Sequence, residues 1–454
     1  MDLLKINKVY FVGIGGIGIS AAARILNQMG KQVSGSDATA SEITVQLEKE
    51  GIDVFISQKA ENIPVDTDLV VYTVAVPTDN PERQRATELG VSQVTYPQLL
   101  GILMRDKLGI GISGTDGKTT TTAILGKILV DADFDPTIVI GSKVDYLGGN
   151  SRIGESKYFV FESDEYKRAF HNYLPQIAGL TNIRADHLDV YKDLEDIKTA
   201  FVEYLERIPN NGLVVINNDD NNCTLISSGI GAKVVSYAID TDADFIASDI
   251  KYIDGKQKFK VAKGGNVLGE VKLSMPGKYN VYNALLSIAI AMEIGIDFGE
   301  IKKSIDNFNG VWRRFEKLGV VNDTEIITDY AHTPEGLRQV ILATQELYSD
   351  SNILFVFQPH QYNRTKNFKD DFISSIKTAK NIILSDIFYV KGREDPTDFN
   401  ISSKELAEES ASEYGGDLDK TEELIRSKID DFDVVVLVGA GDIYNLAKKI
   451  LINK

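Results

Sequence analysis

Residues 108–120 read LGIGISGTDGKTT, an apolar run followed by a glycine-rich turn that carries a lysine and several threonines. The run Leu108–Ser113 predicts a buried strand, and the turn stands between that strand and a predicted helix. Backbone N–H groups and the Lys118 ammonium can surround phosphate groups in such a turn, and the Thr119 hydroxyl can reach Mg²⁺. The spacing differs from that of the usual phosphate loop, since Ile112 stands where the first glycine is expected. We still interpret the turn as a phosphate loop, whose candidate nucleotide-binding residues are Gly114, Thr115, Asp116, Gly117, Lys118, Thr119 and Thr120.

Acidic and histidine side chains follow two later strand ends of the same region. Glu162 and its acidic neighbours come directly after the predicted strand Tyr158–Phe161, and His187 stands in an Asp-His-Leu-Asp run. Carboxylates at a strand end can hold Mg²⁺ beside a nucleotide. A solvated acidic turn and a structural histidine are the ordinary alternatives. The phosphate loop in the same region favours the metal-binding interpretation of the carboxylates, and it makes the histidine motif a candidate for binding either a metal or a phosphate.

The N-terminal region contains another glycine-rich turn, Gly13-Ile-Gly-Gly-Ile-Gly18, between the predicted strand Lys8–Val12 and a predicted helix. Glycines in this position let backbone N–H groups approach a pyrophosphate, and Asp37, at the end of the next strand, can hold a ribose hydroxyl. The alternative is a plain tight turn. The motif predicts a ligand of the dinucleotide type and does not by itself specify NAD.

The composition of the chain limits its partners. It has 454 residues, a formal net charge of −17, one cysteine and four histidines. A domain-wide basic surface is incompatible with this charge, so we expect no nucleic-acid binding. The apolar stretch near the N-terminus is broken by glycines and does not fit a signal peptide, and no apolar run reaches the roughly 18 residues of a membrane span. A lone Cys223 fits a reducing compartment, so we expect a cytoplasmic protein without membrane insertion.

Short apolar strands alternate with helical stretches along almost the whole chain, which is typical of α/β units around parallel sheets. The new strand at Leu108 and a linker at Phe308–Gly310 predict three domains, over residues 1–106, 107–309 and 310–454. Residues 233–274 differ, because their alternating pattern, with turns at Asp254-Gly255 and Gly264-Gly265, predicts a small antiparallel subregion.

Polar clusters in the last third of the chain stand at a helix start, at the second linker and after strands. Asn280 and Asn283 open a predicted helix, where they could bind an adenine edge or cap the helix. The motifs Asp329–Pro334, Gln358–Thr365 and Gly439–Asp442 each follow a predicted strand. We therefore expect them at one edge of a third sheet, where open α/β sheets bind ligands. The alternative for the last motif is a turn with Asp442 as helix N-cap, and we expect His171 to be a surface or packing residue.

Together these motifs resemble those of the Mur ligases, which add amino acids to UDP-N-acetylmuramic acid in peptidoglycan synthesis. The resemblance spans essentially the whole chain and is carried by GIGGIG with Asp37, the run from Val70 to Glu82, GTDGKTTTT, TNIRADHLD, RRFE, VFQPHQYNRT and VGAGD. It implies a Rossmann-like UDP-binding domain, a central P-loop ATPase-type α/β domain with a small β subregion, and a C-terminal Rossmann-like α/β domain that completes the ATP and amino-acid site. Within the family the chain is most similar to the branch that joins L-alanine to UDP-N-acetylmuramate, since Phe201-Val202 stand where other branches carry a carbamylated lysine.

The resemblance also implies a role for each candidate residue. ATP and Mg²⁺ would be the cofactors, Lys118, Glu162 and His187 the catalytic residues, and Thr119, Glu162 and His187 the metal ligands. The nucleotide would further contact Asn280, Asn283, Arg313, Arg314 and Asp329. The UDP-sugar would contact Gly15, Gly16, Gly18, Asp37 and Thr73, and the incoming amino acid His332, His360 and Arg364.

The expected function is thus an ATP-dependent amide ligase that forms an acyl-phosphate intermediate and exists as a monomer or homodimer. Asp116, Thr333 and Gln361 depart from the usual pattern of the alanine-adding branch, which bears on the identity of the added amino acid. The main alternative is a recycling ligase that attaches a preformed peptide to the same sugar nucleotide. An NAD-dependent dehydrogenase, suggested by the first glycine motif alone, and an inactive Mur-like binding protein are the others.

Overall fold

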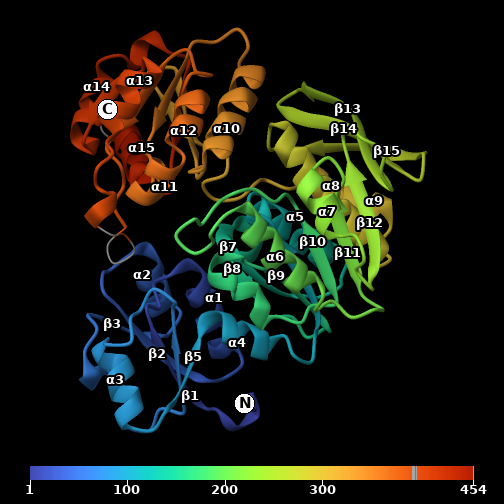
Figure 1. Cartoon of the computed structure of the whole chain (residues 1–454), viewed down its shortest axis with the longest axis vertical. Helices are drawn as coiled ribbons and strands as arrows, with labels where there is room; N and C mark the ends of the chain where they lie inside the picture. The colour runs from blue at the N-terminus through green and yellow to red at the C-terminus, as the bar shows by residue number, and fades with distance from the viewer. Residues whose placement is uncertain (391–393, 395, 453–454) are drawn as a thin grey trace. The chain divides into compact units, whose positions relative to one another are not determined.

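The computed structural model describes residues 1–390, 394 and 396–452, which form two compact units. The first unit consists of Met1–Ile183, Lys198–Asp244 and Leu286–Ser304. The second consists of Arg184–Ile197, Phe245–Leu285 and the described residues from Ile305 onward. Figure 1 shows the course of the chain, from blue at the N-terminus to red at the C-terminus.

The first unit begins with a five-stranded parallel sheet in the order β3-β2-β1-β4-β5. Its elements are β1 (Lys8–Val12), α1 (Ile17–Gln28), β2 (Gln32–Asp37), α2 (Glu42–Lys49), β3 (Asp53–Ile56), β4 (Leu69–Tyr72), α3 (Pro81–Glu88), β5 (Ser92–Thr95) and α4 (Tyr96–Leu103). Side chains alternate along β1, so that Val9 and Phe11 pack with α1, α2 and α4, whereas Tyr10 and Val12 pack with α3. Helices therefore cover both faces, as in a Rossmann-like domain.

A second sheet of the first unit carries the phosphate loop at its centre. Its strands lie in the order β12-β11-β10-β6-β9-β7-β8, and all neighbours are parallel except β7 and β8. The strands are β6 (Leu108–Ser113), β7 (Thr137–Val144), β8 (Gly149–Arg152), β9 (Tyr158–Glu162), β10 (Ile177–Leu180), β11 (Leu213–Asn217) and β12 (Lys233–Ala238). The helices of this region are α5 (Lys118–Asp131), α6 (Leu194–Leu205), α7 (Asn221–Ile226), α8 (Lys278–Glu293) and α9 (Phe298–Asp306). Ser287 of α8 donates a hydrogen bond to the Thr121 carbonyl of α5 at 3.1 Å, so these two helices pack together.

The second unit contains most of the small β subregion predicted over residues 233–274, whereas its first strand, β12, pairs in parallel with β11 and belongs to the sheet of the phosphate loop. The strands of the subregion in the second unit are β13 (Phe245–Ile253), β14 (Lys256–Lys263) and β15 (Asn266–Leu273), paired in hairpin order. The turns lie at Asp254-Gly255 and Gly264-Gly265, and all four residues have positive φ angles. Both predicted turns are therefore confirmed.

The second unit also contains a six-stranded sheet in the order β16-β17-β21-β18-β19-β20, in which only β16 is antiparallel to its neighbour. The strands are β16 (Glu316–Val321), β17 (Thr324–Asp329), β18 (Ile353–Phe357), β19 (Ile382–Ser385), β20 (Glu413–Gly416) and β21 (Val434–Val438). The helices are α10 (Pro334–Leu347), α11 (Tyr362–Asn367), α12 (Lys369–Ile376), α13 (Ser403–Ser410), α14 (Leu418–Arg426) and α15 (Ile443–Ile452). α10, α12 and α13 cover one face, and α14 and α15 cover the other.

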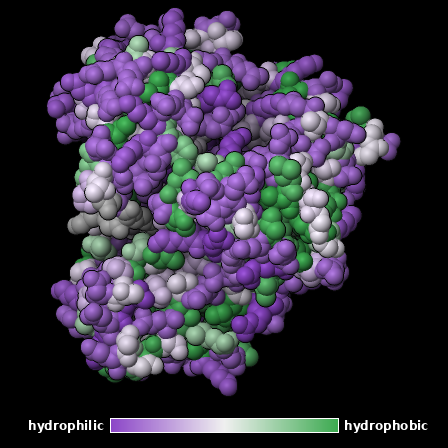
Figure 2. Space-filling model, in the orientation of Figure 1, coloured by the Kyte–Doolittle hydropathy of each residue, from purple (hydrophilic) through white to green (hydrophobic). Residues whose placement is uncertain are grey.

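The structure thus contains the three α/β sheets expected from the sequence, whereas the predicted boundaries after residues 106 and 309 stay predictions. Across the described part of the chain, no helix combines the length and the apolar character needed to cross a bilayer. Hydrophilic side chains predominate on the face drawn in Figure 2.

Candidate active site

The phosphate loop connects the central strand β6 to helix α5. Gly114 and Gly117 have φ angles of +129° and +90°, which favour glycine. A Cβ atom on Gly114 would also lie 2.1 Å from Thr181 Oγ1, so no larger residue fits there. Because α5 begins at Lys118, the unpaired N–H groups of its first turn lie beside the loop. This is the local geometry of an anion-binding turn.

Lys118 is held above the loop by three groups. Its Nζ donates to the carbonyls of Gly114 and Thr115, at 2.5 and 3.1 Å, and lies 2.8 Å from Glu165 Oε2. Burial alone would lower the pKa of this ammonium, but the carboxylates of Glu165, Asp164 and Glu162 raise it above its usual range. Lys118 therefore stays charged at any physiological pH.

Thr119 and Glu162, two predicted metal ligands, are in direct contact. Thr119 Oγ1 donates to Glu162 Oε2 at 3.0 Å, and the Gly141 N–H of β7 donates to Glu162 Oε1. Glu162 ends β9, the strand next to β6, which explains why residues 43 positions apart meet. A hydroxyl and a carboxylate oxygen beside a phosphate loop are the donors that Mg²⁺ prefers.

Asn182, which the sequence analysis did not single out, holds the loop from the β10 side. Its Nδ2 donates to the Asp116 carbonyl at 2.9 Å, and its Oδ1 accepts from the Asp116 N–H at 3.1 Å. Its own carbonyl accepts from the Thr115 N–H at 2.9 Å. Three hydrogen bonds thus fix the loop's backbone through one residue, and its sequence signals are its place just after β10 and its membership of the TNIRADHLD motif.

The predicted UDP-sugar residues gather at the carboxyl ends of β1, β2 and β4. Asp37 Oδ2 accepts from the Gly15 N–H at 2.9 Å, and the Thr73 N–H donates to the Val12 carbonyl at 3.3 Å. Gly16 caps α1, so the helix N-terminus begins at this glycine loop. The arrangement suits a pyrophosphate on the loop with a ribose near Asp37.

Tyr96, another residue missed by the sequence analysis, lies between this loop and the phosphate-loop carboxylates. A Cβ atom on Gly18 would lie 3.1 Å from the Tyr96 ring. Burial, followed by the charges of Glu162 and Asp164, raises the pKa of the Tyr96 hydroxyl above its usual range. The hydroxyl therefore stays protonated and can donate a hydrogen bond.

The second unit brings the three predicted amino-acid-binding residues together with Asp186. Arg364 Nε lies 3.3 Å from Asp186 Oδ1, and less than a tenth of either side chain is exposed. The His332 and His360 rings lie 5.9 Å apart. Arg364 also donates to Gln361 Oε1 at 3.0 Å, so the unusual Gln361 orients the guanidinium.

Charge and burial set the protonation of this cluster. Burial alone would raise the pKa of Asp186, but Arg364 and His187 hold it well below its usual range. Burial, assisted by the charge of Arg364 and by His360, lowers the pKa of His332 far below 6.5. At neutral pH the cluster thus contains a carboxylate, a guanidinium and a neutral His332.

Two buried groups, Arg313 and Asp329, form hydrogen bonds with the backbone around the RRFE box. Arg313 Nη2 donates to the carbonyls of Gly439 and Gly441, at 2.6 and 3.0 Å, and so holds the loop after β21. Asp329 accepts from the Phe315 and Ala331 N–H groups, at 2.8 and 2.7 Å. Burial raises the pKa of Asp329. Arg313 and Asp329 thus stabilise the backbone around the box.

The remaining candidates also lie in the second unit. Asn280 and Asn283 are buried in α8, and Asn280 Nδ2 donates to the Pro276 carbonyl at 2.7 Å rather than capping the helix. The carboxylate of Asp442 accepts from Gln358 Nε2 at 2.7 Å. His187 has a φ angle of +53°, and its N–H donates to Asp186 Oδ1 at 2.7 Å. His171, in the first unit, stacks on Phe170 with ring centroids 4.8 Å apart, which confirms it as a packing residue.

The fold and these sites define a multidomain α/β protein with a phosphate-binding loop at the carboxyl end of a central parallel strand. Three family profiles match it in chain order: "Mur ligase family, catalytic domain" over residues 8–108, "Mur ligase middle domain" over 112–291 and "Mur ligase, glutamate ligase domain" over 313–441. The chain belongs to the Mur ligase family. The resemblance and the three-domain α/β fold class predicted from the sequence are confirmed.

Similar proteins cover essentially the whole chain. The UDP-N-acetylmuramate–L-alanine ligase of Caldanaerobacter subterraneus subsp. tengcongensis is 39% identical over 99% of this chain and 98% of its own length. The ligase of the same name from Aquifex aeolicus is 35% identical over 98% of both chains. The solved UDP-N-acetylmuramate-alanine ligase MurC of Thermotoga maritima is 30% identical, covers 98% of both chains and has a TM-score of 0.83.

Proposed function

We propose that this chain is an ATP-dependent ligase that joins UDP-N-acetylmuramate to L-alanine in cytoplasmic peptidoglycan synthesis. The observation that carries the proposal is the contact of Thr119 with Glu162 beside Lys118 at the phosphate loop. The names of the full-length relatives support the choice of substrates.

The reaction brings anionic reactants together, which explains why the proposed site carries a lysine and candidate ligands for a metal cation. An oxygen of the sugar's carboxylate attacks the γ-phosphorus of ATP, the bond to ADP breaks, and an acyl phosphate forms. The alanine amine then attacks the acyl carbon, inorganic phosphate leaves, and the nitrogen loses a proton. Lys118 offsets the negative charge on the transferring phosphoryl group. Mg²⁺, held by Thr119, Glu162 and His187, would add further charge neutralisation.

We assign Arg314, rather than Arg313, to the nucleotide phosphates. Both guanidinium groups lie over the Tyr330 ring, at 4.8 Å for Arg313 and 5.0 Å for Arg314, but Arg313 also donates to two backbone carbonyls. A cation that rests on an aromatic ring can move to a phosphate without breaking backbone hydrogen bonds. Asn280, Asn283 and Asp329 are the proposed groups around the rest of the nucleotide.

We assign the carboxylate of the incoming L-alanine to Arg364. The neutral His332 then acts as a hydrogen-bonding group and not as a competing cation, and the His360 ring lies beside it. Gln361 orients Arg364, so this departure from the usual pattern has a positioning role. The UDP-sugar is assigned to Gly15, Gly16, Gly18, Asp37 and Thr73.

A recycling ligase is the second candidate. The murein peptide ligase of Psychrobacter arcticus covers 98% of both chains with a TM-score of 0.76 at 24% identity, a likeness of fold alone. The deciding experiment measures phosphate release from ATP with UDP-N-acetylmuramate and a panel of single amino acids and short peptides. We expect turnover with L-alanine. Turnover with a tripeptide and with no single amino acid would establish the recycling function instead.

A further inference from the structure

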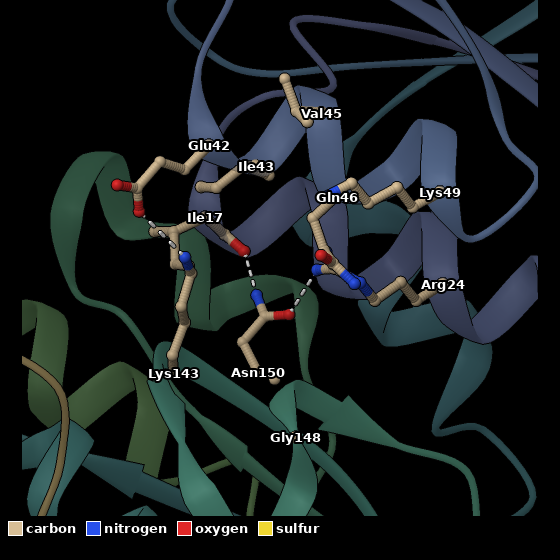
Figure 3. Close-up of a pocket in the computed structure, with 11 residues that line it drawn as sticks. Ile17, Arg24, Glu42, Ile43, Val45, Gln46, Lys49, Lys143, Gly148 and Asn150 are labelled. Carbon is tan, nitrogen blue, oxygen red and sulfur yellow. Dashed lines mark hydrogen bonds and ion pairs between the residues drawn. The ribbon is translucent and has the colours of Figure 1, made fainter.

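Asn150 connects the glycine loop's helix to the sheet that carries Glu162. Its Nδ2 donates to the Ile17 carbonyl at 2.5 Å, and its Oδ1 accepts from Arg24 Nη1 at 2.7 Å. Figure 3 shows both bonds reaching from β8 to α1. Only 1% of Asn150 is exposed, so both halves of the amide are committed to one helix.

One end of this contact adjoins the glycine loop in sequence, and the other lies in the sheet that carries Glu162. Ile17 is the first residue of α1 and directly follows the glycine loop. Asn150 lies in β8, which pairs with β7, and the Gly141 N–H of β7 donates to Glu162. One side chain therefore joins the helix after the proposed UDP-sugar loop to β8, and the neighbouring strand β7 donates a hydrogen bond to a proposed metal ligand.

The interface beside this contact is not completely filled. A cavity of about 380 Å³ borders it, lined among others by Ile43, Val45, Gln46, Lys143 and Gly149. The ion pair of Lys143 with Glu42, also drawn in Figure 3, is long at 3.5 Å and largely exposed. A close-packed interface would fix the orientation by shape, whereas here the buried amide supplies the directional contact.

We propose that Asn150 is a positioning residue that sets the glycine loop relative to Glu162 for phosphoryl transfer. The inference rests on the proposed function, because it takes the UDP-sugar on the glycine loop and ATP on the phosphate loop. A misplacement of about 1 Å between reacting groups can lower a rate by about two orders of magnitude. Loss of the contact therefore lowers kcat while each substrate still binds its own loop.

The test uses Asn150→Asp in the full chain. The new carboxylate still accepts from Arg24 but opposes the Ile17 carbonyl in place of the lost donor. We expect kcat to fall about tenfold or more. Dissociation constants for UDP-N-acetylmuramate and for a non-hydrolysable ATP analogue, each measured alone by calorimetry, stay within about twofold of wild type.

Two further variants keep the test decisive. Arg24→Lys retains a cation for Glu50, which Arg24 binds at 2.6 Å, but removes the guanidinium N–H that Asn150 accepts. Arg24→Lys is expected to lower kcat as Asn150→Asp does. If Asn150→Asp fails to fold, the kcat of Arg24→Lys tests the positioning role. Glu42→Gln removes the charge from the long pair with Lys143 and is the matched control with unchanged kcat.

The outcomes separate this inference from the proposed function. An unchanged kcat in a folded Asn150→Asp or Arg24→Lys variant overturns the positioning role. The positioning role is also overturned if kcat falls only in proportion to a loss of UDP-sugar affinity, because Asn150 would then only support the glycine loop. If the wild-type protein turns over none of the proposed substrates, the proposed function itself fails.

Discussion

Glu165 binds the Lys118 ammonium with both carboxylate oxygens, at 2.8 and 2.9 Å. The lysine proposed to bind nucleotide phosphates is thus already paired with a buried anion, which also raises its pKa. The Glu165 carboxylate and bound phosphates would share the Lys118 cation, so their negative charges would repel each other at short range.

Glu165→Gln is therefore expected to strengthen metal-free ATP binding, by about three- to tenfold, because one opposing charge is removed. Calorimetry in the presence of a chelator measures the dissociation constant. Glu203→Gln is the matched control, since Glu203 pairs with Arg168 at an exposed position. Weaker ATP binding by Glu165→Gln would show that Glu165 supports the loop more than it repels phosphate.

Lys118→Ala and Glu162→Ala are each expected to reduce turnover by about three orders of magnitude or more, because each removes a charge needed in phosphoryl transfer. UDP-N-acetylmuramate binding should change less than about twofold, since neither residue lies on the glycine loop. Phosphate release and calorimetry measure the two quantities. Near-normal turnover by either variant would refute the site assignment.

Asn182→Asp is expected to raise the KM for ATP, because the new oxygen faces the Asp116 carbonyl where Nδ2 donated a hydrogen bond. It should also lower the free energy of unfolding by about 1–3 kcal/mol. Asn222→Asp is the matched control, since Asn222 Nδ2 donates at 2.8 Å to the carbonyl of Ile183, the residue after Asn182, and not to the loop backbone. A similar stability loss is expected there with an unchanged KM. Equal KM values in both variants would exclude a specific role for Asn182.

The lowered pKa of His332 predicts a pH dependence of stability. In the unfolded chain this histidine takes up a proton as the pH falls through about 6.5, whereas in the folded protein it stays neutral to much lower pH. Protonation therefore favours the unfolded chain, and stability declines as the pH falls below 6.5. His332→Gln should show a shallower decline between about pH 7 and pH 5 in thermal unfolding. An identical slope in both proteins would contradict the buried, neutral state.

The sequence predicts the sheets well where apolar runs are long. The strands β1 and β6 begin and end where the sequence analysis expected them. It missed the edge strands β3 (Asp53–Ile56) and β5 (Ser92–Thr95), because each has only four residues and neither alternates between apolar and polar side chains. Edge strands bury little, so hydrophobic pattern is weak there.

The candidate site shows the same limit at the level of contacts. Local motifs predicted Thr119 and Glu162 correctly as neighbours of one loop. The bonds of Lys118 with Glu165 and of Asp116 with Asn182 were not foreseen. They depend on β9 and β10 flanking β6, an order that periodicity along the chain does not specify.

The discontinuity of the first unit has a consequence for protein synthesis. Ser287 and Thr121, which join α8 to the helix of the phosphate loop, are 166 residues apart. Leu286 and Ile290 of the same helix cover Gly179 of β10. During synthesis, all strands of the first sheet are complete once residue 95 has been added. Helix α8 is complete only almost 200 residues later. The N-terminal sheet can thus fold during translation, whereas the nucleotide-binding core stays incomplete until its last segment emerges.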